Sequence, residues 1–174
     1  MSDSLITIVA IFLAAILMFI FPLMTLADRN DDITQLTVQT ATTEFIDEIR
    51  RTGKLTWDQY NSFISTLAAT GNAYDVELRF QILDENPSKK TANGEGVTVI
   101  GENVYYSVYT TQIVDRLTEA GKYTLKEGDI VSITVKNRGQ TLAQTLRNIY
   151  YKVSGDDTYT IAASSSGTVT VNGK

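Results

Sequence analysis

The sequence of 174 residues contains no cysteine, no histidine and only two prolines. Without cysteine there can be no disulfide bridge, and without either cysteine or histidine there can be no Cys/His zinc site. A Ser-His-Asp triad is excluded as well, because histidine is its proton-transfer group. The sequence therefore says little about a chemical reaction, and its information concerns where the chain sits and what it packs against.

Positive charge is also scarce. The chain has 15 Lys+Arg against 20 Asp+Glu, which gives a formal net charge of -5 and a pI near 4.7. Proteins that bind nucleic acid neutralise phosphates with Lys and Arg, so an acidic chain of this kind is not expected to use nucleic acid as a partner.

Paired acidic residues are the remaining candidates for acid–base chemistry. Asp84-Glu85 and Asp156-Asp157 occur in stretches typical of turns, and no other group is positioned around them by the sequence. Serine and lysine are both present, but no spacing singles out a Ser-Lys pair. The sequence therefore predicts no catalytic residue, no enzymatic activity and no cofactor.

The strongest feature is a run of 23 uncharged residues from Leu5 to Ala27. As a helix it would reach roughly 34 Å, enough to cross a hydrocarbon core of about 30 Å. The leader MSDS has no basic residue and the run lacks a small-x-small cleavage site, so we expect a retained anchor and not a removed signal peptide. A buried core helix is the alternative, but helices that are apolar all round belong to large cores or membranes.

Pro22 interrupts the apolar run close to its end. Proline lacks the amide hydrogen that would be donated to the Met18 carbonyl, so the sequence predicts a kink or local unwinding here. Neighbouring helices or Thr25 could satisfy the freed carbonyl.

Asp28-Arg29-Asn30-Asp31-Asp32 follows the apolar run. Its D-x-N-x-D pattern opens like a calcium loop, but Ile33 replaces the required glycine and Gln39 the bidentate glutamate, so we predict no metal site. The acidic residues are instead expected to mark the water-facing end of the membrane helix.

An amphipathic pattern begins after this acidic segment. Apolar residues recur three to five positions apart and predict a helix from Asp32 to Thr52, which ends at Gly53. If this helix continues the apolar run, the chain has one long N-terminal helix. We accordingly divide the chain into a membrane or filament-core helix (1–27), an amphipathic helix (28–53) and an extracytoplasmic head (54–174).

The remaining sequence alternates short helices with strands. Capping boxes at Thr56/Gln59 and Thr141/Gln144 predict two helix starts. A third helix is predicted over 110–120, and strands are predicted over 74–82, 97–100, 104–109, 123–125 and 130–135. The end of the chain predicts a hairpin, with strands over 158–163 and 168–171 joined by a Ser-Ser-Ser-Gly turn. The fold class is therefore α+β, with an antiparallel sheet and inserted short helices.

A hydrophobic N-terminal helix, a proline at residue 22, an amphipathic continuation and a β-rich head together resemble type IV pilins and pseudopilins. The strings FPLMTLADRNDD, TEFIDEIRRTGK, YDVELRFQILDENP and EGDIVSITVKN are also similar to membrane-anchored proteins of tight-adherence (Tad) pilus loci in Gram-positive bacteria. In pilins a glutamate at the fifth mature position neutralises a neighbour's amino terminus. This chain departs from that pattern because it has Leu5 there, and only Asp3 is acidic near the N-terminus.

The resemblance implies a pilin-like subunit, major or minor, of an extracellular filament or its assembly machinery. Copies of the chain, or other pilin-like subunits, would then pack through their N-terminal helices. Small residues at Ala10, Ala14 and Ala15 would allow close helix contact, and Pro22 would let the helix bend between bilayer and filament. Asp3 is expected to pair with an amino terminus once it is buried.

The alternative is a single-pass, membrane-anchored binding module that does not polymerise. The aromatic face that contains Trp57 and Tyr60, or the loop that begins at Asp84 and Glu85, would then contact a partner. Such an aromatic stripe at helical spacing is more often part of the core. A threonine-rich composition without cysteine favours an extracytoplasmic head in both cases.

Overall fold

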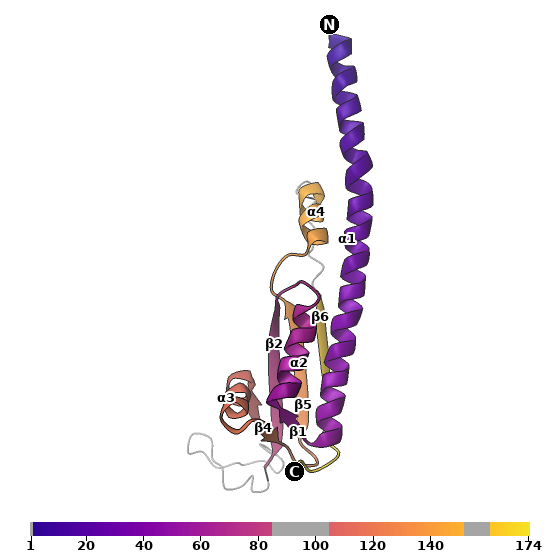
Figure 1. Cartoon of the computed structure of the whole chain (residues 1–174). Coiled ribbons are helices and arrows are strands. Elements are labelled where there is room, and N and C mark those ends of the chain that lie inside the picture. Colours follow the sequence, from indigo (N-terminus) through magenta and orange to yellow (C-terminus); the bar gives the residue numbers. More distant parts are fainter. Residues whose placement is uncertain (1, 85–104, 152–160) are drawn as a thin grey trace, which may run out of the picture.

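The computed structural model describes residues 2–84, 105–151 and 161–174. A single helix, α1 (Ser2–Thr52), runs along the whole molecule, and the head packs beside its C-terminal half (Figure 1). The layout of one long helix, an antiparallel sheet and short helices confirms the predicted α+β class. The apolar run and the amphipathic segment form one continuous helix, as the sequence pattern indicated.

The long helix ends where the sequence predicted. Gly53 adopts a φ of 66°, a left-handed conformation that favours glycine, and its amide donates to the Ile49 carbonyl at 2.8 Å. A side chain at this position would also collide with the returning C-terminal segment, because a Cβ built on Gly53 lies 2.2 Å from the Val171 carbonyl oxygen.

A four-stranded antiparallel sheet forms the centre of the head. Its strands are β2 (Tyr74–Leu83), β3 (Tyr105–Tyr109), β5 (Ile130–Asn137) and β6 (Ala162–Thr168), in the spatial order β3-β2-β5-β6. Alternation along β2 places Leu78 and Phe80 in the core, and Phe80 is paired in register with Val131. The strand predicted over 97–100 lies outside the described residues.

The core lies between one face of α1 and this sheet. Val38, Ile46 and Ile49 recur at helical spacing on α1 and are almost completely buried. They pack with Leu78 and Ile133 of the sheet, so the amphipathic half of α1 contributes directly to the core of the head.

Shorter elements surround the sheet. A two-stranded sheet pairs β1 (Lys54–Thr56) with β4 (Lys122–Thr124), and the pairing of β1 was not predicted. The helices α2 (Trp57–Ala68), α3 (Thr110–Ala120) and α4 (Leu142–Tyr151) begin close to the predicted residues. Both hydrogen bonds of the capping box join Thr56 and Gln59 at the start of α2.

The predicted terminal hairpin is wrong. The Ser-Ser-Ser-Gly segment lies inside the single strand β6, which pairs with β5 along its length. Neighbouring contacts override the turn-like composition, because Arg50 of α1 donates from Nε to the Thr168 carbonyl at 3.1 Å and lies against Gly167, where a Cβ would be 2.4 Å from that nitrogen. A side chain at residue 167 would require the Arg50 side chain to move from this position.

Candidate functional site: the apolar half of α1 and its junction with the head

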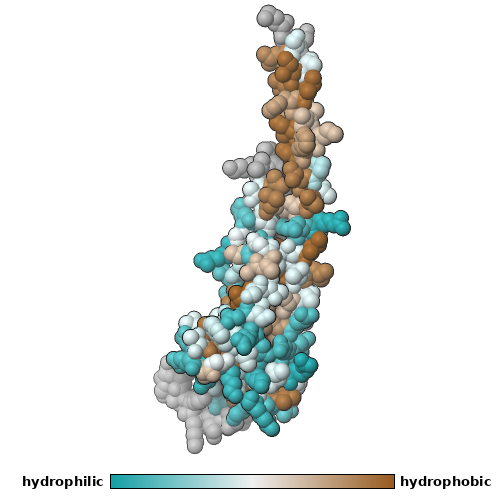
Figure 2. All heavy atoms as spheres, viewed as in Figure 1, coloured by the Kyte–Doolittle hydropathy of each residue, from teal (hydrophilic) through white to brown (hydrophobic). Residues whose placement is uncertain are grey.

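The N-terminal half of α1 projects beyond the head as an uncovered apolar rod. Every side chain from residue 4 to residue 19 is exposed, and the most apolar window of the helix has no buried residue (Figure 2). Ala10, Ala14 and Ala15 all lie on this exposed part, and Asp3 belongs to the first turns of the helix. By length and composition α1 is able to cross a membrane.

The sequence predicted a kink or local unwinding at Pro22, and local unwinding does not occur. The α-helix continues through this residue, whose side chain is exposed. Thr25 does not satisfy the Met18 carbonyl either, because its hydroxyl donates to the Phe21 carbonyl at 3.1 Å. A proline removes one helical hydrogen bond, but the turns on both sides retain theirs and keep the helix continuous.

The acidic segment at residues 28–32 lies within α1 and not in a loop. Helical geometry sends its carboxylates in different directions, whereas a calcium loop must wrap around the ion. Within residues 2–84, 105–151 and 161–174, no group of three or more acidic side chains is arranged to hold a metal ion. The side chain of Asp31 points into the protein and is only 5% exposed.

Asp31 joins α1 to the start of α4. Its Oδ2 accepts a hydrogen bond of 2.5 Å from the Thr141 hydroxyl, which also accepts from the Gln144 amide at 3.2 Å. The Gln144 side chain in turn accepts from the Thr141 amide at 2.9 Å. The predicted capping box is therefore present, and the buried carboxylate of α1 completes it.

Gln35, one turn further along α1, holds the first residue of β6. Its Nε2 donates to the Ala162 carbonyl at 2.7 Å and its Oε1 accepts from the Ala162 amide at 3.0 Å. The amide side chain thus pairs with the strand backbone as a neighbouring strand would. Together with Asp31 and Arg50, it fixes the head on α1 at widely separated points.

An open groove of about 540 Å³ lies where the apolar run meets this junction. Its walls are mostly apolar side chains, and the charged residues that line it are Arg29 and the buried Asp31. Leu142, the first residue of α4, is the groove's contribution from the head and is 64% exposed. The remaining lining residues are Leu23, Leu26, Ala27, Asn30 and Ile33.

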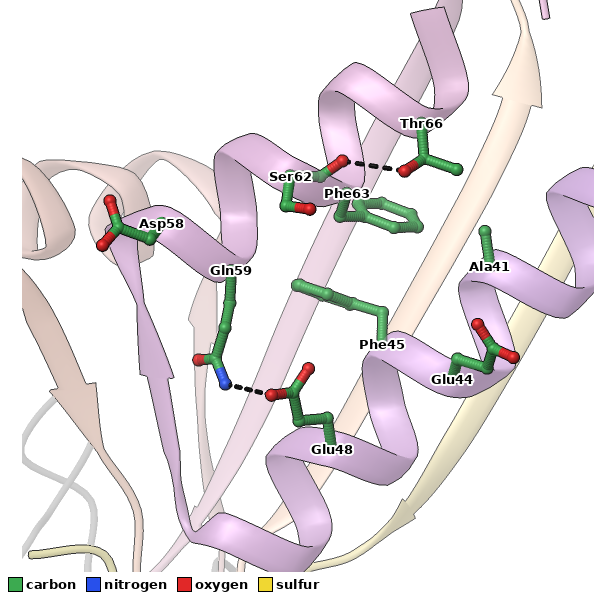
Figure 3. A pocket seen from close by; sticks show the side chains of 9 residues that line it. All are labelled: Ala41, Glu44, Phe45, Glu48, Asp58, Gln59, Ser62, Phe63 and Thr66. Atoms are coloured by element: carbon green, nitrogen blue, oxygen red, sulfur yellow. Dashed lines mark hydrogen bonds between the residues drawn. The ribbon is translucent and has the colours of Figure 1, made fainter. Parts of the chain in front are cut away.

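A second groove, of about 410 Å³, separates α1 from α2 (Figure 3). The rings of Phe45 and Phe63 stack between the two helices, with centroids 4.4 Å apart. Glu48 accepts a hydrogen bond of 2.7 Å from the Gln59 side chain, and the capping residue of α2 is thereby connected to α1. Acidic side chains from both helices border this groove: Glu44, Glu48 and Asp58.

The aromatic face of α2 is mainly part of the core. Phe63 is buried and Tyr60 is half-buried, whereas Trp57 is 36% exposed and its ring centroid lies 6.0 Å from that of Tyr60. Partial burial raises the pKa of the Tyr60 hydroxyl above its usual value, because the charged form loses solvation. Of the two aromatic residues predicted to contact a partner, Trp57 and not Tyr60 has an exposed ring.

Asp84 follows β2 and is partly exposed, and Glu85 lies outside the described residues. A second exposed aromatic group, not predicted as a site, occurs nearby on β3, where Tyr105, Tyr106 and Tyr109 are exposed. The tyrosine-rich sequence of β3 was the signal that could have identified this group.

No family model, curated protein or solved structure matches this chain.

Proposed function

We propose that this chain is a pilin-like structural subunit of an extracellular filament of the type IV or Tad kind, or of its assembly machinery. The N-terminal halves of α1 pack together in the core of the assembly, and the heads lie outside. The role is structural and requires neither a catalytic step nor a cofactor. Before assembly the same apolar helix holds the subunit in the membrane.

The observation that carries this proposal is the exposed apolar side of α1 beyond its acidic segment. Ile33 is 58% exposed and Leu36 is 65% exposed, so the head leaves much of both side chains uncovered. A bilayer covers the run that ends at Ala27, but the charged residues that follow keep Ile33 and Leu36 outside the hydrocarbon. A protein neighbour would bury them, so they favour assembly over a simple lipid anchor.

The apolar half of α1 can exchange its lipid neighbours for other helices with little change in free energy. Lipid tails and apolar side chains are similar environments, so helix packing in place of lipid costs little hydrophobic free energy. Ala10, Ala14 and Ala15 provide small side chains for close approach. Asp3 is expected to pair with an amino terminus in the assembly, since an unpaired charge in an apolar core is costly.

Electron microscopy of sheared surface material tests the proposal in cells that produce either the native chain or a variant. Leu36→Glu places a charge at the expected contact and should strongly reduce the number of filaments. Gln39→Glu is the matched control, because it adds the same charge at another exposed position of α1 and should leave filaments intact. Filaments as abundant with Leu36→Glu as with the native chain would contradict the assigned contact.

A membrane-anchored binding module is the second candidate, and exposed aromatic side chains favour it. Trp57 on α2 and the tyrosines of β3 are available to a partner, and the acidic rim of the α1–α2 groove fits a basic side chain. If the native chain occurs only as lipid-embedded monomers, and Leu36→Glu, Pro22→Ala and Asp3→Ala are all without effect, this function replaces the filament subunit.

A further inference from the structure

The start of α4 combines buried polar groups with an exposed apolar side chain. Thr141 and Gln144 are almost completely buried, whereas Leu142 between them is 64% exposed. A segment that faces water usually has the opposite arrangement, with its leucine inside and its polar groups outside. Polar groups that are buried and already hydrogen-bonded, next to an exposed apolar side chain, suit a surface that contacts lipid, where no water is available to bond them.

The position of α4 along α1 places it at the edge of a bilayer. Leu142 borders the same groove as Leu23 and Leu26, which belong to the last turns of the uncharged run. Figure 1 shows α4 beside α1, beyond the end of the sheet and on the side of the N-terminus. If residues 5–27 cross a bilayer, α4 must therefore lie in or next to its headgroup layer.

Hydrogen bonding also prepares this end of α4 for a site with little water. The amides of Thr141 and Gln144 are satisfied within the capping box, and the Thr141 hydroxyl donates to Asp31. A helix start with these groups already paired loses less free energy on leaving water than one without a cap. The bond to Asp31 also fixes the height of Leu142 along α1.

We infer that the groove between α1 and the start of α4 is a lipid-docking surface, which receives the upper acyl-chain and glycerol region of a bilayer lipid. The acidic segment 28–32 beside the groove carries three aspartates against one arginine, so a zwitterionic lipid suits it better than an anionic one. The head is thereby seated on the membrane through Leu142. This inference requires a bilayer around α1, which both candidate functions include, but it does not require a filament.

Depth-dependent fluorescence quenching tests the inference on the full chain in phosphatidylcholine vesicles. The chain has no cysteine, so a single introduced thiol carries the fluorescent label. Leu142→Cys is the test variant. Phe12→Cys, within the apolar run, reports insertion of α1 into the bilayer. Val171→Cys is the control for a label that stays in water, because Val171 is 48% exposed and lies near the C-terminus at the opposite end of the head (Figure 1).

Lipids that carry the nitroxide near the headgroup should quench the label at Leu142→Cys. This quenching should be at least ~3-fold stronger than that of the label at Val171→Cys, as expected for a side chain buried about 5–10 Å into the membrane interface. Phe12→Cys should be quenched best by a nitroxide deep in the acyl chain. Urea unfolding of each labelled variant checks that the fold is retained. Anionic lipid or added salt should not increase the signal at Leu142→Cys.

Equal quenching at Leu142→Cys and Val171→Cys, with Phe12→Cys inserted, would overturn the inference and leave the filament proposal untouched. A second outcome would also overturn the inference: quenching of the Leu142→Cys label by lipid that falls as protein density rises at constant lipid composition. That result would assign the groove to a second copy of the chain. Absence of quenching at Phe12→Cys would refute the bilayer placement of α1 itself.

Discussion

Substitution of Thr141 by valine should destabilise the head by about 2–4 kcal/mol. The hydroxyl accepts from the Gln144 amide at the start of α4, and loss of such a helix cap costs about 1 kcal/mol. It also donates to the carboxylate of Asp31 at 2.5 Å, and a hydrogen bond to a charged group contributes about 1.5–3 kcal/mol. Valine matches threonine in shape, so packing changes contribute little.

Equilibrium urea unfolding of the full chain in detergent, followed by the fluorescence of the single tryptophan Trp57, measures this loss. Hydrogen exchange of the Ala143 to Thr145 amides should accelerate in parallel. Thr141→Ser retains the hydroxyl and is the matched control, with an expected loss below ~1 kcal/mol.

A double-mutant cycle separates the two contributions of the hydroxyl. Asp31→Asn keeps an oxygen that can accept from Thr141 but removes the charge. In that background Thr141→Val should cost only about 1–2 kcal/mol, because the charged hydrogen bond is already absent. A loss for Thr141→Val below ~0.5 kcal/mol, or equal losses in both backgrounds, would refute the assigned role of Asp31.

Three further changes test the packing of the head by urea unfolding. Gly173→Ala should destabilise it by about 1–3 kcal/mol, because the added Cβ would lie 2.0 Å from a backbone carbonyl oxygen. The control is Gly139→Ala, which has open space around it and should be nearly neutral. Equal effects of the two substitutions would contradict the reasoning. Phe63→Ala should cost about 3–5 kcal/mol by removing the ring stacked at 4.4 Å, and a loss below ~1 kcal/mol would contradict its place in the core. Burial raises the pKa of both Tyr60 and Tyr123 above the usual value of 10.0. Their contribution to the free energy of unfolding is therefore constant below pH 10 and is lost as the pH rises through their pKa values in the folded state. Substitution of both tyrosines by phenylalanine should weaken this alkaline loss, which a series of unfolding curves between pH 8 and 11 would show.

Local signals in the sequence predicted the elements that depend on neighbours in the chain. The Thr56/Gln59 capping box and the stop of α3 at Gly121, which has a φ of 72°, need only residues three or four positions away. The alternation along β2 likewise belongs to one short segment. These parts of the fold, and the exposure of the apolar half of α1, follow directly from the order of the residues.

Long-range contacts explain what the sequence did not predict. The Ser-Ser-Ser-Gly segment resembles a turn, and only pairing with β5 and the contact of Gly167 with Arg50 make it a strand. The acidic segment indicated a boundary, but its spacing contains no sign that Asp31 faces Thr141, 110 residues later. The groove beside Leu142 depends on this same contact, and a single sequence offers no local pattern for it.

The attachment of β6 to α1 has a consequence for the synthesis of the chain. Gln35 binds the backbone of Ala162, which is 127 residues further on, and Arg50 binds that of Thr168, 118 residues further on. At about 5–20 residues per second, translation needs ~6–25 s to cover the longer interval. During that time the buried face of α1 has no β6 to cover it, so the nascent helix is a target for chaperones or for premature association. The head can close only after its last strand leaves the ribosome, and truncations that remove β6 should therefore leave the head unfolded.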